Sequence, residues 1–125
     1  MFFMPPINDS NSELSGSLGL AGSINANADT GLVCAQAQHG SAPEIAGQNI
    51  ANPTSLILSA AMMLTWLGEQ RSEHTLMKAG RAIENAVDQV LSNPLHRTRD
   101  LGGTASTSEF ANRVADTVRH STTGL

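Results

Sequence analysis

The stretch HGSAPEIAGQNIANP, from His39 to Pro53, is the part of the sequence that best predicts the fold and the ligand of this chain. Gly40, Ser41 and Ala42 carry little or no side chain, so a ligand can approach the backbone closely. Successive N–H groups in such a turn form a concave anion site that suits a pyrophosphate. Glu44 can accept hydrogen bonds from a ribose diol, and its charge would repel a 2′-phosphate. These residues predict a loop that binds a dinucleotide.

The two ends of the loop carry polar side chains. His39 adds a donor or acceptor at one edge, and Asn52 can either cap the following helix or present its amide to a base. The loop is not a Rossmann fingerprint, because no G-x-G-x-x-G follows a strand, and no Walker A lysine is present.

Before the loop, residues 31–38 (GLVCAQAQ) predict a strand with Val33, Ala35 and Ala37 on one face. Cys34 is expected to be an inert, buried thiol. Residues 14–30 are rich in Gly, Ser, Asn and Ala and predict a flexible loop with one or two turns.

After the loop, the first predicted helix opens at Asn52-Pro53 and stops at Gly68. It is apolar nearly all round and should be buried on most faces, with Met62, Met63 and Trp66 in the core. A second helix spans about 72–91 and ends before Asn93-Pro94, and a third begins at the capping-box pattern Ser106-x-x-Glu109. Three helices and one strand offer few neighbours that could bury the first helix. This indicates that the chain is part of a larger domain.

Composition bounds the function. Apolar residues make up 40% of the 125 and charged residues 14%, which excludes a disordered polyelectrolyte. The net charge of -4 argues against a nucleic-acid partner. The longest apolar run falls short of the roughly 20 residues that span a bilayer, so no membrane partner is expected. The lone Cys34 excludes an internal disulfide and suits a cytoplasmic location.

The loop, the helix after it and DLGGTASTSEF (100–110) together closely resemble the β-decarboxylating dehydrogenase family of isocitrate, isopropylmalate and tartrate/malate dehydrogenases. The resemblance covers about residues 9–119 and is nearest to NAD-dependent isopropylmalate or tartrate/D-malate dehydrogenases. It implies an α/β fold: a partial isopropylmalate-dehydrogenase-like domain, helix-rich with one or two strands. Residues 1–13 are then an irregular segment, and 14–125 are the C-terminal part of the cofactor-binding domain.

The resemblance also implies a set of cofactor contacts. The residues expected to contact NAD are His39, Gly40, Ser41, Ala42, Glu44, Ile45, Asn52 and Asp100. An acid at Glu44 looks like the NAD-using members rather than the NADP-using ones. Two alternatives stay open: Asp100 could instead cap a turn before Gly102-Gly103, and Asn52 could serve first as the helix cap.

By resemblance, the reaction is oxidation of a 2-hydroxy acid by hydride transfer to NAD, with Mg²⁺ or Mn²⁺ bound and a carboxylate lost as CO₂. The family's substrate arginines, Tyr and Lys lie upstream of the matched stretch. This sequence has no Tyr, and Lys78 lies outside any matched motif, so no catalytic residue is assigned. Asp9 falls where the family has the later of two metal aspartates, but Pro5 replaces the earlier one, and a single carboxylate is a poor Mg²⁺ site.

Departures from the family are Gln36, where Glu is common, and Gly22, where Pro is usual. For this chain alone the expectation is an NAD-binding fragment without turnover. Other readings stay open: half of a split dehydrogenase completed by an N-terminal chain, a non-catalytic assembly subunit that docks on a full-length relative, or a truncated remnant. Because family members are dimers, a relative is a plausible partner.

Overall fold

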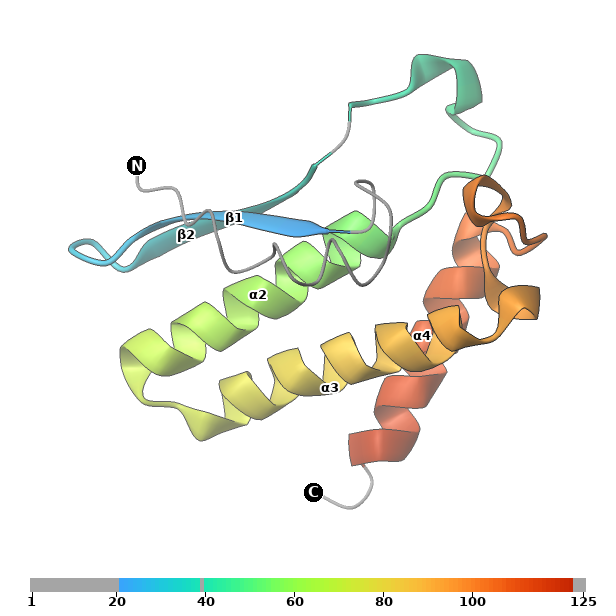
Figure 1. The fold of residues 1–125 in the computed structure, drawn as a ribbon. Coiled ribbons are helices and arrows are strands. Elements are labelled where there is room, and N and C mark those ends of the chain that lie inside the picture. Colours follow the sequence, from blue (N-terminus) through green and yellow to red (C-terminus); the bar gives the residue numbers. More distant parts are fainter. Residues whose placement is uncertain (1–20, 39, 123–125) are drawn as a thin grey trace. The chain divides into compact units, whose positions relative to one another are not determined.

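The computed structural model describes residues 21–38 and 40–122, and Figure 1 shows the order of the elements. The strands and helices are β1 (Gly22–Asn27), β2 (Leu32–Ala37), α2 (Thr54–Arg71), α3 (His74–Ser92) and α4 (Thr107–Thr122). Short 3-10 turns are η3 (Pro43–Ile45), η4 (Pro94–His96) and η5 (Arg99–Leu101). This is the helix-rich α/β arrangement with two strands that the sequence predicts.

The chain forms two compact units. Unit 1 contains the described residues up to 38 together with Thr54–Arg81, and unit 2 contains Gly40–Pro53 and the described residues from Ala82 onward. The N-terminal part of α3 therefore belongs to unit 1 and its C-terminal part to unit 2.

Unit 1 is built on an antiparallel hairpin in which Gly22 pairs with Ala37 and Asn27 with Leu32. The prediction of a flexible loop over 14–30 is wrong for its described part, because β1 occupies Gly22–Asn27. Within β1 the side chains of Ile24 and Ala26 are buried. The Gly, Ser and Asn residues between them have low strand propensity and hide the alternation from a sequence reading.

Helix α2 packs against both strands, and Figure 1 shows it running along the hairpin. Its Met62 and Trp66 form a core with Ile24 and Ala26, which confirms the two α2 residues as core. Val33 of β2 is partly buried against this cluster, as predicted for its face of the strand. Cys34 points the other way and is exposed, so the prediction of a buried thiol is wrong.

Two buried serines bind α2 to the strand backbones. The Ser55 hydroxyl donates to the Ala21 carbonyl at 2.6 Å and accepts from the Gln38 N–H at 2.9 Å. The Ser59 hydroxyl accepts from the Ser23 N–H at 2.8 Å and lies 2.7 Å from the Gln36 carbonyl oxygen. These bonds satisfy main-chain groups that would otherwise lose water at the helix–sheet contact.

Two predictions for this helix need correction. It begins at Thr54 and continues through Gly68 to Arg71. Gly68 is buried, and a Cβ there would lie 2.5 Å from the Met77 Cγ, so this glycine allows close approach of the next helix instead of ending its own. The helix is also less enclosed than predicted, since Leu56 is 54% exposed.

Unit 2 buries one stripe of each of its helices. Ala86, Val87 and Val90 of α3 are buried, as are Phe110 and Val114 of α4. Helix α3 begins at His74, two residues later than predicted, and ends at Ser92, before Asn93-Pro94 as predicted. Each of these two helices therefore has one apolar stripe in the core of the unit.

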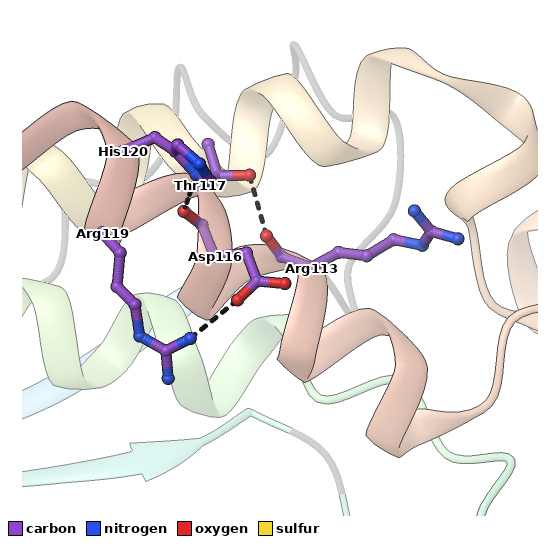
Figure 2. A network of polar contacts seen from close by, with 5 residues as sticks. All are labelled: Arg113, Asp116, Thr117, Arg119 and His120. Carbon is purple, nitrogen blue, oxygen red and sulfur yellow. Dashed lines mark hydrogen bonds and ion pairs between the residues drawn. The ribbon is translucent and has the colours of Figure 1, made fainter.

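The capping box of α4 is confirmed. The Glu109 N–H donates to the Ser106 Oγ at 3.1 Å, and the Ser106 N–H donates to Glu109 Oε1 at 3.0 Å. Near the other end of α4, Arg119 pairs with Asp116 at 2.7 Å, with both side chains largely exposed (Figure 2). His120 Nδ1 lies 2.7 Å from the Asp116 carbonyl oxygen, so this histidine makes a contact within its own helix, which the same figure marks.

Within the described part of the chain, no helix is long and apolar enough to cross a membrane.

Candidate nucleotide-binding site

The loop from Gly40 to Pro53 lies in unit 2 together with Asp100. It holds three left-handed residues: Ala42 at φ 44°, Gly47 at φ 79° and Asn49 at φ 59°. An alanine in this region costs roughly 1–2 kcal/mol relative to ordinary backbone, so its neighbours must hold it there. The loop therefore has a defined, partly strained course.

The turn η3 exposes an acid at the centre of the loop. The Ile45 N–H donates to the Ala42 carbonyl at 3.1 Å, and Gln48 Nε2 donates to the Glu44 carbonyl at 2.9 Å. The second bond uses the carbonyl of Glu44, whose carboxylate is exposed and has no partner among the described residues. That carboxylate can accept two hydrogen bonds from vicinal hydroxyls.

Two of the predicted site residues, far apart in the sequence, meet in the structure. Asn52 Nδ2 donates to Asp100 Oδ2 at 3.0 Å. The other carboxylate oxygen of Asp100 accepts from the hydroxyl of Thr98, which is fully buried. Asp100 thus joins the turn after α3 to the end of the loop.

Sequence reasoning missed Asn49, which ties the loop to the first turn of α4. Its Oδ1 accepts from the N–H of Ser108 at 3.1 Å and from its hydroxyl at 3.0 Å, and its carbonyl accepts from the Thr107 N–H at 3.0 Å. The Thr107 hydroxyl in turn donates to the Ala51 carbonyl at 2.5 Å. An asparagine two residues after a glycine is a signal for a left-handed turn with side-chain capping, and it could have been noticed.

The DLGG segment is shaped by close packing of its own backbone. Gly102 adopts φ 84°, and a Cβ on Gly103 would lie 1.9 Å from the Arg97 carbonyl oxygen. The Ala105 N–H donates to that same carbonyl at 3.0 Å. The two glycines therefore allow the turn that presents Asp100, which gives this motif a structural role.

The remaining residues predicted to contact the cofactor or the metal differ in where they lie. His39 and Asp9 lie outside the described residues. Gly40 and Ser41 are exposed on the loop, Ile45 is partly buried, and Gln36 points away from the core. In the ranges 21–38 and 40–122 no group of three His, Cys, Asp or Glu side chains could hold a metal ion.

The carboxylate of Glu109, in the first turn of α4, has a shifted pKa. Hydrogen bonds from the backbone and side chain of Ser106, aided by Arg113, lower the pKa of Glu109 below its ordinary value. This supports a capping role for the carboxylate rather than an acid–base role.

Comparison with known proteins agrees with this picture. The model of the isocitrate/isopropylmalate dehydrogenase family matches residues 6–114. The chain belongs to the isocitrate/isopropylmalate dehydrogenase family.

Its relatives within the family are much longer. The chain is 42% identical to an isocitrate dehydrogenase [NAD] catalytic subunit 6, mitochondrial, from Arabidopsis thaliana, over 88% of this chain and 27% of the relative. It is 47% identical to an isocitrate/homoisocitrate dehydrogenase from Thermus thermophilus, over 85% and 29%. The crystal structure of a β-decarboxylating dehydrogenase from Thermococcus kodakarensis superposes with a TM-score of 0.71 at 33% identity, over 91% and 31%. The chain therefore spans about three tenths of these proteins.

Proposed function

We propose that this member of the isocitrate/isopropylmalate dehydrogenase family binds the adenosine and phosphate portion of NAD through the loop from Gly40 to Pro53 and Asp100. The observation that carries the proposal is the hydrogen bond between Asn52 and Asp100, which joins two separately predicted contacts at one place. The Arabidopsis relative is named as an NAD-dependent isocitrate dehydrogenase subunit, which supports the same cofactor here.

The residues present suit this group. The exposed Glu44 carboxylate would accept hydrogen bonds from the ribose hydroxyls. Gly40 has open space around its Cα, because a Cβ there would meet nothing within 4 Å, so a phosphate can come close to the main chain. Ser41, Ala42 and Ile45 would line the approach, and His39, which lies outside the described residues, stays a predicted contact. When bound, the cofactor supplies the hydride acceptor for oxidation of a 2-hydroxy acid.

The metal of the family reaction is a separate matter. The described residues include no group of three His, Cys, Asp or Glu side chains that could hold Mg²⁺ or Mn²⁺. For the polypeptide of 125 residues by itself we expect no turnover, because it has no Tyr and its single lysine, Lys78, is exposed on α3. The substrate arginines and base would come from a further part of the family fold, in the same chain or in a partner. The assignment of 14–125 to the cofactor-binding domain and the cytoplasmic location stay predictions.

Isothermal titration calorimetry with NAD and with NADP tests the proposal. NAD should bind more tightly than NADP, because the charge of Glu44 repels a 2′-phosphate. Glu44→Gln should weaken NAD binding roughly ten-fold, the value of a hydrogen bond to a charged group, and should narrow the preference over NADP. Glu69→Gln changes an exposed acid on α2 in unit 1 and is the matched control. Equal NAD affinity in Glu44→Gln and wild type, or a preference for NADP, would refute the assignment.

A split dehydrogenase or an assembly subunit differs from this proposal in its partners. Affinity purification from the native source distinguishes them, because a split enzyme would bring down a separate chain with the missing family part, and an assembly subunit would bring down a full-length relative.

A further inference from the structure

Asn49 is the residue that connects the proposed cofactor loop to α4, and no comparison or motif assigns it a role. It lies between Gln48 and the IANP block. We infer that Asn49 is a positioning residue that sets the course of the loop by capping the first turn of α4. The part of this inference that concerns NAD rests on the proposed function, whereas the capping part does not.

The N-terminus of α4 carries backbone donors that need partners from outside the helix. The leading N–H groups of a helix have no partner within it. Here Thr107 N donates to the Asn49 carbonyl and Ser108 N to its Oδ1, while Glu109 N donates to Ser106 Oγ. One loop residue therefore satisfies two successive donors of α4, and the capping box satisfies the third.

These hydrogen bonds require a left-handed backbone conformation at Asn49. Asn49 can offer its carbonyl and its side chain to adjacent N–H groups because it adopts φ 59°. Asparagine tolerates this left-handed region better than most residues, whereas a β-branched residue does not. Position 49 thus needs a residue that tolerates a positive φ and carries a short side chain with a hydrogen-bond acceptor.

The same end of α4 also holds the segment that leads to Asn52. The bond from the Thr107 hydroxyl to the Ala51 carbonyl holds the chain between Asn49 and Asn52 at the same helix end. Asn52 then reaches Asp100. Loss of the Asn49 cap would therefore loosen the segment that delivers Asn52, without removing any group that touches a ligand.

The variants separate the two requirements at position 49. Asn49→Gly keeps the left-handed backbone and removes the side-chain acceptor, and Asn49→Asp keeps the acceptor and adds a charge that favours a helix N-terminus. Ala46→Gly introduces the same added flexibility at another exposed position of the loop and is the matched control.

Hydrogen–deuterium exchange of the wild-type chain and these variants, without NAD, measures how strongly Asn49 protects the first turn of α4. Asn49→Gly should speed exchange about five-fold in the amides of 107–109 and 48–52, the effect of losing the side-chain hydrogen bonds to Ser108. Exchange in β1, β2 and α2 should not change. Asn49→Asp and Ala46→Gly should leave 107–109 as in wild type. Unchanged protection of 107–109 in Asn49→Gly, or faster exchange in Asn49→Asp, would overturn the inference.

Calorimetry on the same proteins tests the link to NAD. Asn49→Gly should weaken NAD binding about three- to five-fold, and Asn49→Asp should restore it. If Asn49→Gly exchanges faster but binds NAD as tightly as wild type, Asn49 caps α4 but has no positioning role for the cofactor. If wild type fails to bind NAD, the proposed function and the positioning role fail together, and the exchange data still decide the cap.

Discussion

Asn52 and Asp100 are separated by 48 positions in the sequence and share a hydrogen bond of 3.0 Å. The bond joins the end of the IANP block to the start of the DLGG block. These two motifs are the strongest family signals in the sequence, and the structure gives a physical reason for their joint presence: each holds the other in place.

The first prediction concerns this pair. Asp100→Ala should destabilise the chain by about 1–3 kcal/mol, because it removes the acceptor for the buried Thr98 hydroxyl as well as for Asn52. Asn52→Ala should cost less, since Asn52 is only partly buried. Urea unfolding of both single variants and the double variant gives the coupling, which we expect to be about 0.5–1 kcal/mol. Additive effects would mean that the bond contributes nothing in solution.

The second prediction concerns the buried serines of α2. Ser55→Ala should cost about 1–3 kcal/mol of unfolding free energy, because it leaves the Gln38 N–H and the Ala21 carbonyl without their partner. Ser59→Ala should behave similarly. Thr75→Ala, at an exposed position of α3 in unit 1, should change stability by less than about 0.5 kcal/mol. Chemical denaturation followed by circular dichroism measures all three, and a serine variant as stable as the Thr75 control would contradict the anchoring role.

The third prediction compares two glycines. Gly103→Ala should destabilise unit 2 by more than about 2 kcal/mol, since its Cβ would overlap the Arg97 carbonyl and the backbone must move. Gly40→Ala should leave the thermal midpoint nearly unchanged, because open space surrounds that position. It should nevertheless weaken NAD binding if a phosphate approaches the loop there. Thermal melts with and without NAD distinguish the two effects, and a marked loss of stability in Gly40→Ala would show that the space around it is filled.

The fourth prediction is a pH dependence. Because the pKa of Glu109 is lowered in the folded chain, its ionised form stabilises the fold above the ordinary carboxyl value of 4.5. That contribution is lost as the pH falls from 4.5 through the lower folded value. Glu109→Gln keeps an acceptor for the Ser106 N–H but cannot titrate, so its stability should fall less steeply with acid than that of wild type.

Thermal midpoints measured in steps between about pH 6 and pH 3 check this difference. Glu73→Gln, an exposed acid before α3, is the control and should follow the wild-type profile. Parallel profiles for wild type and Glu109→Gln would rule out a titrating cap at this position.

Local patterns in the sequence determined much of the helical structure. The capping box of Ser106 and Glu109 fixed the start of α4, and Asn93-Pro94 marked the end of α3, because both signals act through neighbouring backbone groups. The face of β2 that carries Val33 and Ala35 also followed from alternation alone. The composition of the loop from His39 to Pro53 pointed to its expected ligand for the same local reason.

Only the tertiary structure decided the features that depend on distant partners. Strand β1 exists because β2 and the serines of α2 complete its hydrogen bonds, which its own small and polar residues do not announce. Gly68 lies inside its helix, where a side chain would overlap Met77. The roles of Asn49 and Asp100 likewise arise from bonds across 59 and 48 positions. A hydrogen bond across such a separation forms only when packing of the whole unit brings its two ends together, and no local pattern records it.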